Sequence, residues 1–225
     1  MTEVKEETIK VRGKNVQAKL QYFDKSDMKD LQKIYTAWKN LDKKIRRLLP
    51  KYKSKTYGRT SNIPDILTEG AFAYFGKCPR LVGNFTKSKS SKAKKLPSSS
   101  ADCYDKKNKK TVQVKASSTG KNGKCNDLTS FGPKSEFDKL YFLDFYRKGK
   151  RDGKFDVYDI PIGFLYKTKV KKNMTLEQRA KKEGKRPRLS IMNKVIIPYN
   201  NKAKKRKNSD AKRLRYKTYD LFKSV

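Results

Sequence analysis

Positive charge constrains this chain more than any other feature of its sequence. The 225 residues contain 59 Lys and Arg against 22 Asp and Glu, which gives a formal net charge of +37. Such a surplus opposes compaction unless a polyanion neutralises part of it. We therefore expect a nucleic-acid partner, because each neutralised phosphate releases a condensed counterion. The alternative is a solvated, lysine-rich surface without such a partner.

The apolar content is nevertheless high enough for a packed core. Apolar residues make up 35% of the chain and aromatic residues 11%, and a chain of this length buries roughly 70% of its unfolded surface as one domain. We expect a single domain over residues 1–225, without internal repeats. It should carry basic loops and a basic C-terminal segment, at residues 87–100, 117–133, 181–188 and 200–225.

Several classes of protein are excluded by residue types that are missing or rare. The chain has no His, which excludes His-ligated zinc fingers, HNH and phospholipase-D-like nucleases, and Ser-His or Cys-His catalysis. Its Cys residues, Cys78, Cys103 and Cys125, are odd in number and widely spaced, as in reduced intracellular proteins. No apolar run approaches the roughly 18 residues of a membrane-spanning helix, and we expect no secretory leader.

Two helices are predicted in the first third of the chain. Apolar residues recur at steps of three and four over residues 25–49, which predicts a long amphipathic helix, with Ser26 as a possible cap and Pro50 as its stop. A second helix should start near Asn62, which can cap it, with Pro64 in its first turn. Glu69 is a lone carboxylate in this apolar second segment, and a buried carboxylate needs a partner such as a metal ion or a Lys.

The middle of the chain predicts a β-hairpin. Residues 101–105 and 111–116 have strand character, and the segment 106–110 is suited to a turn between them. In the second strand, Gln113 and Lys115 point to one face, and Val112, Val114 and Ala116 point to the other. If the hairpin closes, Asp102 approaches Gln113 and Lys115 across the strands.

The remaining elements follow from shorter patterns. The aromatic and aliphatic run within residues 137–146 predicts a buried central strand. A further strand is expected over residues 157–166, a short helix from Thr175, and a last strand over residues 194–198. Together these elements predict an α/β (α+β) protein.

The arrangement Asp102, Gln113-Val114-Lys115, with Glu69 on a preceding helix, resembles the PD-(D/E)xK nuclease superfamily and most of all type II restriction endonucleases. The resemblance covers about residues 59–145 and implies a restriction-endonuclease-like core, a central mixed sheet flanked by helices. It also implies Mg²⁺ held by Asp102, Gln113, Glu69 and the carbonyl of Val114. Lys115 would then position or deprotonate the attacking water.

The motif departs from the family pattern at Gln113, where the family has an acid. An amide oxygen can ligate a hard cation but brings no negative charge, so metal affinity would depend on Asp102 and Glu69. Asp105 is a competing ligand if the hairpin register differs. The triplet alone carries no weight, because seven acids elsewhere in the chain have Lys two positions on: Glu3, Asp27, Asp42, Asp105, Asp152, Glu183 and Asp210. In the structural alternative, Asp102 pairs with Lys115 and Glu69 neutralises a Lys or Arg.

The resemblance also implies double-stranded DNA as substrate, a homodimer that reads a short palindrome, a companion DNA methyltransferase, and a cytoplasmic protein of prokaryotic or viral origin. Arg, Lys, Asn and Gln are the side chains suited to base edges and phosphates. We expect the following residues to contact DNA: Arg59, Lys121, Asn122, Lys124, Asn126, Lys185, Arg186 and Arg188. Two alternatives remain: another nuclease of this superfamily, such as a junction resolvase or repair nuclease, and a non-catalytic nucleic-acid-binding protein.

Overall fold

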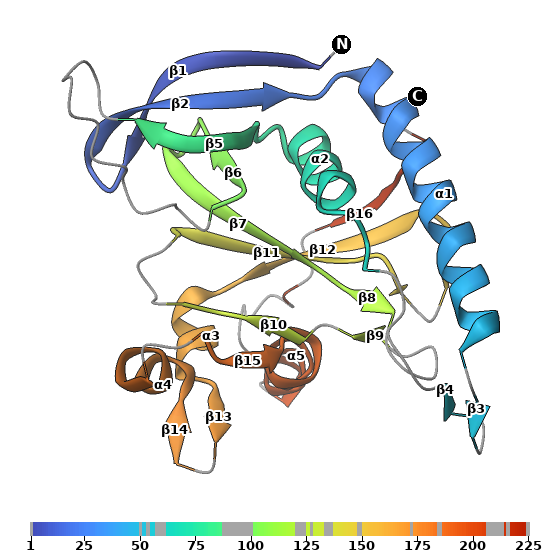
Figure 1. The fold of residues 1–225 in the computed structure, drawn as a ribbon. Helices are drawn as coiled ribbons and strands as arrows, with labels where there is room; N and C mark the ends of the chain where they lie inside the picture. The colour runs from blue at the N-terminus through green and yellow to red at the C-terminus, as the bar shows by residue number, and fades with distance from the viewer. Residues whose placement is uncertain are drawn as a thin grey trace.

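The computed structural model is built around one large mixed sheet with helices on both faces (Figure 1). It describes residues 2–49, 51–52, 55–56, 62–86, 101–119, 125–126, 128–132, 137–147, 150–171, 173–183, 186–205, 214 and 217–223. This architecture confirms the predicted mixed α/β fold, which is consistent with a restriction-endonuclease-like core. No described helix is both long enough and apolar enough to cross a membrane.

The large sheet has 8 strands in the order β1-β2-β5-β6-β7-β11-β12-β16. Neighbouring strands are antiparallel except β7 and β11, which are parallel. The strands are β1 (Glu3–Val11), β2 (Lys14–Tyr22), β5 (Arg80–Thr86), β6 (Cys103–Asp105), β7 (Lys110–Ala116), β11 (Lys139–Asp144), β12 (Lys154–Ile160) and β16 (Lys217–Asp220). Two-stranded sheets are formed by β3 (Lys51–Tyr52) with β4 (Lys55–Thr56), β8 (Ser118–Thr119) with β9 (Cys125–Asn126), β10 (Leu128–Ser130) with β15 (Arg188–Ser190), and β13 (Lys169–Lys171) with β14 (Met174–Thr175).

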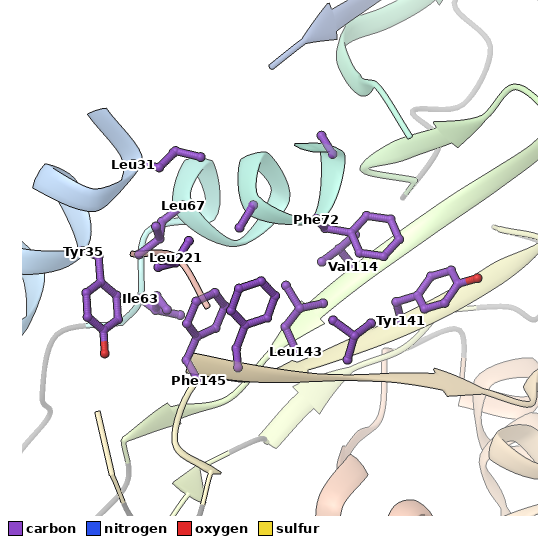
Figure 2. Packing of buried hydrophobic residues seen from close by; sticks show 14 of the residues in the cluster. Leu31, Tyr35, Ile63, Leu67, Phe72, Val114, Tyr141, Leu143, Phe145 and Leu221 are labelled. Atoms are coloured by element: carbon purple, nitrogen blue, oxygen red, sulfur yellow. The ribbon is translucent and has the colours of Figure 1, made fainter. Parts of the chain in front are cut away.

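The helices form two layers that bury alternate residues of the central strands. Tyr141 and Leu143 of β11 pack in one core cluster, and Leu140 and Phe142 pack in another on the opposite face. The first cluster lies beneath α1 (Lys25–Leu48) and α2 (Asp65–Gly76) (Figure 2). The second lies against α3 (Ile162–Lys167), α4 (Leu176–Glu183), α5 (Ile197–Lys205) and the π-helical turn Met192–Ile196. A strand buried on both faces requires a continuous apolar run, which is why the prediction for residues 137–146 is confirmed.

The two N-terminal helices form where predicted but begin differently. Asp24, not Ser26, caps α1, because its carboxylate accepts the backbone N–H groups of Ser26 and Asp27 while Asp27 bonds back to the N–H of Asp24. This reciprocal capping box satisfies donors that would otherwise be unpaired. Asn62 does not cap α2; Pro64 occupies the cap position without a side-chain hydrogen bond.

Three sequence predictions in the C-terminal half are wrong. The expected strand at 157–166 ends at Ile160, and α3 follows Pro161, because proline lacks the N–H that a strand ladder needs. The segment 194–198 is helical rather than a strand, since its apolar residues pack as a helical face against the second core. The expected loops at 117–133 and 181–188 contain parts of β8, β9, β10, α4 and β15.

Both chain ends contribute strands that the sequence left unassigned. β1 and β2 form a hairpin in which Val11 pairs with Lys14. The loop residues Arg12 and Gly13 both have positive φ, 51° and 79°, as the favoured two-residue hairpin turn requires. At the other end β16 pairs with β12, so part of the basic C-terminal segment belongs to the sheet.

Leu143→Ala is expected to lower the free energy of unfolding by about 2–5 kcal/mol, because it leaves a cavity in a fully buried strand. Leu143 is 0% exposed. Leu48→Ala makes the same chemical change at a position that is 85% exposed, and should change stability by no more than about 0.5 kcal/mol. Urea denaturation monitored by circular dichroism measures both. Equal losses in the two variants would contradict this placement of the core.

Candidate active site

The hairpin of β6 and β7 brings Asp102 against Gln113. Cys103 pairs with Val112, and the backbone N–H of Asp102 donates to the carbonyl of Val112 at 2.8 Å. On the other side of the same residue, the carbonyl of Asp102 accepts the N–H of Leu81 in β5 at 2.8 Å. The backbone of Asp102, which immediately precedes β6, is thus fixed between β5 and β7.

The carboxylate of Asp102 is bound by groups of β7. Its Oδ2 accepts the backbone N–H of Val114 at 2.7 Å and a hydrogen bond from the side-chain amide of Gln113. Gln113 Nε2 also lies 3.4 Å from the carbonyl oxygen of Val114. A carboxylate, an amide and a backbone carbonyl therefore meet at one point, while the Val114 side chain packs in the first core cluster.

Lys115 lies next along β7 and is half-buried. Its positive charge lowers the pKa values of both Asp102 and Glu69, although other influences dominate each carboxyl. Among the described residues, no ion pair joins Lys115 to Asp102, so the structural alternative of a direct salt bridge between them is not what the geometry shows. Lys115 acts on these carboxyls through space.

Glu69 projects from α2 and forms an ion pair with Arg80 at the start of β5, as the structural alternative expected of this carboxylate. Glu69 Oε2 lies 2.5 Å from Arg80 Nε, and Arg80 also donates to Oε1 of Gln21 in β2 at 3.2 Å. Burial raises the pKa of Glu69, and the hydrogen bond and charge of Arg80 oppose this rise without cancelling it. Sequence reasoning missed Arg80, since nothing in the chain distinguishes it from the 58 other Lys and Arg residues.

Burial raises the pKa of Asp102 to about 7 from an ordinary value of 3.8. The charge of Lys115 opposes the rise, whereas the neighbouring charges of Glu69 and Asp65 add to it. Asp65 was not proposed as a site residue. Its position four residues before Glu69 places both on one side of the helix, and this spacing is the signal that could have found it. The charges of Glu69 and Asp65 therefore reach Asp102, with Lys115 and Arg80 as the neighbouring cations.

Asp105, the competing ligand, is bound elsewhere. Its Oδ2 lies 2.9 Å from Lys139 Nζ, and its carboxylate also accepts both the backbone N–H and the amide of Asn108. Burial alone would raise the pKa of Asp105, but these bonds outweigh burial and lower it. Asp105 is therefore committed to the hairpin turn and to β11, and takes no part in the Asp102 cluster.

The residues expected to contact DNA are mostly outside the described part of the chain. Arg59, Lys121, Asn122, Lys124 and Lys185 lie outside the described residues, and for Asn126 only the backbone, in β9, is described. Arg186 and Arg188 are exposed, and Arg188 begins β15. Neither touches the Asp102 cluster by any described contact, so their role stays a prediction.

The donor set is suited to a hard cation. Carboxylate, amide and carbonyl oxygens are the ligands that Mg²⁺ and Ca²⁺ prefer, and Asp102, Gln113 and Val114 supply one of each. Within the described ranges, no three His, Cys, Asp or Glu side chains are grouped closely enough to hold a metal by themselves. The neutral oxygens would thus have to complete the ligand set, and Glu69 would have to exchange Arg80 for the cation.

Comparison with known proteins places the chain among restriction enzymes. The model of the Bsp6I restriction endonuclease family matches residues 23–198. The type II restriction enzyme Bsp6I of Bacillus sp. (strain RFL6) is 28% identical over 176 residues, which cover 77% of this chain and 83% of that protein. No solved structure gives a significant match. The matched region contains α1, α2 and the whole β5–β12 part of the sheet, and the chain belongs to the Bsp6I restriction endonuclease family.

Proposed function

We propose that this endonuclease is a type II restriction enzyme of the PD-(D/E)xK kind that uses Mg²⁺ to hydrolyse phosphodiester bonds at a short sequence in double-stranded DNA. The observation that supports this best is the meeting of Asp102, the Gln113 amide and the Val114 carbonyl beside Lys115, with Glu69 near enough to raise the pKa of Asp102. A buried carboxylate with a raised pKa is a common mark of a functional site.

In this proposal Asp102, Gln113, Glu69 and the Val114 carbonyl hold the cation. The unfavourable burial of Asp102 is relieved when a positive charge replaces its proton. Gln113 presents its amide nitrogen to Asp102 in the structure, and a half-turn of the amide group would present its oxygen instead. Bound Mg²⁺ supplies a Lewis acid for the scissile phosphate and lowers the pKa of a bound water.

Lys115 is proposed as the group that handles the attacking water. It follows Val114 on the same strand and faces the same side as Gln113, so its ammonium group can orient the water or stabilise charge that develops on the phosphate. Glu69 is held by Arg80, which keeps a second carboxylate at the site in the absence of a cation. Arg80 is therefore a positioning residue for Glu69 in this scheme.

Double-stranded DNA as the substrate and a homodimer as the assembly are also part of this proposal. Double-stranded DNA suits the charge of +37, and a homodimer would place two such sites on the two strands of a palindrome. The exposed Arg186 and Arg188, with Arg59, Lys121, Asn122, Lys124, Asn126 and Lys185, are proposed DNA contacts. A host methyltransferase would protect the genome without binding the nuclease.

The deciding experiment is digestion of plasmid and phage DNA by the purified protein, with Mg²⁺ and with EDTA. The proposal expects discrete bands with Mg²⁺ and intact DNA with EDTA. Smearing, or nicking only at branched structures, would instead favour a resolvase or repair nuclease. Intact DNA in both reactions, with DNA binding present in a gel-shift assay, would leave a non-catalytic nucleic-acid-binding protein.

A further inference from the structure

A site rich in Lys and Arg lies on the C-terminal half of α1, on elements that the Asp102 cluster does not use. A groove of about 510 Å³ runs along this part of the helix, where Arg151 from the connection between β11 and β12 packs against it. Its lining includes Lys39, Lys43 and Arg47 of α1 together with Arg151 of the connection. We call it the Arg151 groove. Asp42 is its only acidic lining residue among the described part of the chain.

A fully buried carboxylate, Asp42, holds two arginines of this groove, Arg46 and Arg151. Asp42 is 0% exposed, and its Oδ2 lies 2.7 Å from Arg46 Nε and also accepts a hydrogen bond from Arg151. Burial tends to raise the pKa of Asp42, but the two guanidinium groups outweigh burial and lower it. The carboxylate therefore stays charged and holds both guanidinium groups in place.

Arg151 is further fixed by two aromatic rings. Its guanidinium carbon lies 5.4 Å from the ring centre of Trp38 and 5.7 Å from that of Tyr146. A guanidinium has five N–H donors, and in the described structure Arg151 uses one of them on Asp42. A fixed guanidinium with donors to spare is preorganised for a phosphate, which such groups bind in bidentate fashion.

Three further cations form a row along the same helix. Lys39, Lys43 and Arg47 are exposed and spaced four residues apart, so they follow one another at about 6 Å along the helix axis. Like charges at this spacing destabilise an isolated helix by a few tenths of a kcal/mol per pair. The helix dipole favours cations only in the last turn, so it accounts for Arg47 but not for Lys39 or Lys43.

We propose that the Arg151 groove binds the phosphate backbone of double-stranded DNA and acts as an anchoring site apart from the catalytic cluster. The row spans about 12 Å, which corresponds to between three and four phosphates of one strand at a rise of about 3.4 Å each along the duplex axis. The phosphates neutralise the positive charges of the row and so relieve the repulsion between them. Arg151, which Asp42 holds in place, binds one phosphate. The proposal rests on the proposed function only in taking duplex DNA as the occupant.

The test measures binding in EDTA, so that cleavage plays no part. Fluorescence anisotropy with a labelled 20-base-pair duplex gives the affinity across salt concentrations for wild type and for the double variant Lys43→Ala, Arg47→Ala. The matched control is Lys25→Ala, Lys29→Ala, which removes two exposed cations from the other end of α1. Neither pair belongs to the core or to the Asp102 cluster, so both proteins should fold.

The slope of log affinity against log salt should fall by about 2 in the groove variant, since each phosphate contact contributes about 0.9. Affinity at 0.1 M salt should then fall by roughly 10- to 100-fold. Equal slopes for wild type and the groove variant, or an equal loss in the control, would overturn the proposal. This binding experiment tests only the proposed anchoring site, because the proposed role of the Asp102 cluster is tested separately by DNA cleavage.

A second arm separates DNA from a small anion. Inorganic phosphate is added to wild type and to the groove variant, and the melting temperature is followed. The proposal expects the two proteins to respond alike to millimolar phosphate while differing in DNA affinity. Stabilisation by phosphate that is lost in the groove variant, together with unchanged DNA affinity, would make the groove a small-anion site and refute the DNA assignment.

Discussion

Lys115→Ala is expected to slow DNA cleavage by roughly 10²- to 10⁴-fold while duplex binding changes by only a few fold. This is the usual range for loss of a group that transfers a proton or stabilises developing charge in the transition state. Lys115 lies beside the Asp102 carboxylate on β7 and influences it electrostatically. Its removal should therefore affect the chemical step and not the many phosphate contacts that a chain of +37 can form.

Single-turnover cleavage of a plasmid, with the enzyme in excess, measures this effect without interference from product release. Lys110→Ala is the matched control, because Lys110 is exposed at the start of the same strand. It should cleave at nearly the wild-type rate. If Lys115→Ala cut as fast as Lys110→Ala, the water-handling role would belong to another residue, and the proposed site would be misplaced.

Asp102→Asn is expected to slow DNA cleavage by a factor similar to that of Lys115→Ala. In metal-free buffer near pH 8, the same change should raise the free energy of unfolding by about 2–4 kcal/mol. The carboxyl of Asp102 has a pKa of about 7 in the folded protein and an ordinary value of 3.8. Between these values the folded state holds its proton more tightly than the unfolded state does. Wild-type stability should therefore fall as pH rises through this window, whereas asparagine carries no such cost.

Urea denaturation of both proteins from pH 4.5 to 8 in EDTA measures this difference, which should grow with pH. Added Mg²⁺ should narrow it, because a cation that binds the native carboxylate stabilises the wild type. Asp105→Asn is a control of opposite sign: the pKa of Asp105 is lowered by Lys139 and Asn108 against the effect of burial, so its loss should destabilise the protein above pH 4. A pH-independent difference for Asp102→Asn would contradict the burial of a charged group at this position.

The candidate cluster could be predicted where its contacts are local. Asp102 and Gln113 lie on the two arms of one hairpin, and strand alternation alone places Gln113 and Lys115 on the same face. Glu69 was found because a carboxylate in an apolar helix is conspicuous. Its partner Arg80 was not found, because pairing between α2 and β5 depends on how the helix docks against the sheet.

The dependence on tertiary packing also explains the errors in the predicted secondary structure. The run at 194–198 is short and apolar, and such runs do not distinguish a strand from a buried helical segment. The structure makes it helical by packing Val195 and Ile196 against the second core. The β1–β2 hairpin lies outside the family match, yet Gln21 from it reaches Arg80, a contact that no local pattern indicates.

By itself the sequence determined the polycationic character of the protein, the absence of histidine chemistry, the two N-terminal helices, the buried β11 strand and the hairpin that carries Asp102, Gln113 and Lys115. These follow from composition and from periodicity within about 25 residues. Arg46 meets Asp42 four residues away on the same helix, but only the tertiary structure decided which of the 59 cations come to these carboxylates from other elements, namely Arg80 at Glu69 and Arg151 at Asp42. Coulomb attraction acts between any such pair, so the docking of helices and loops on the sheet selects the partners.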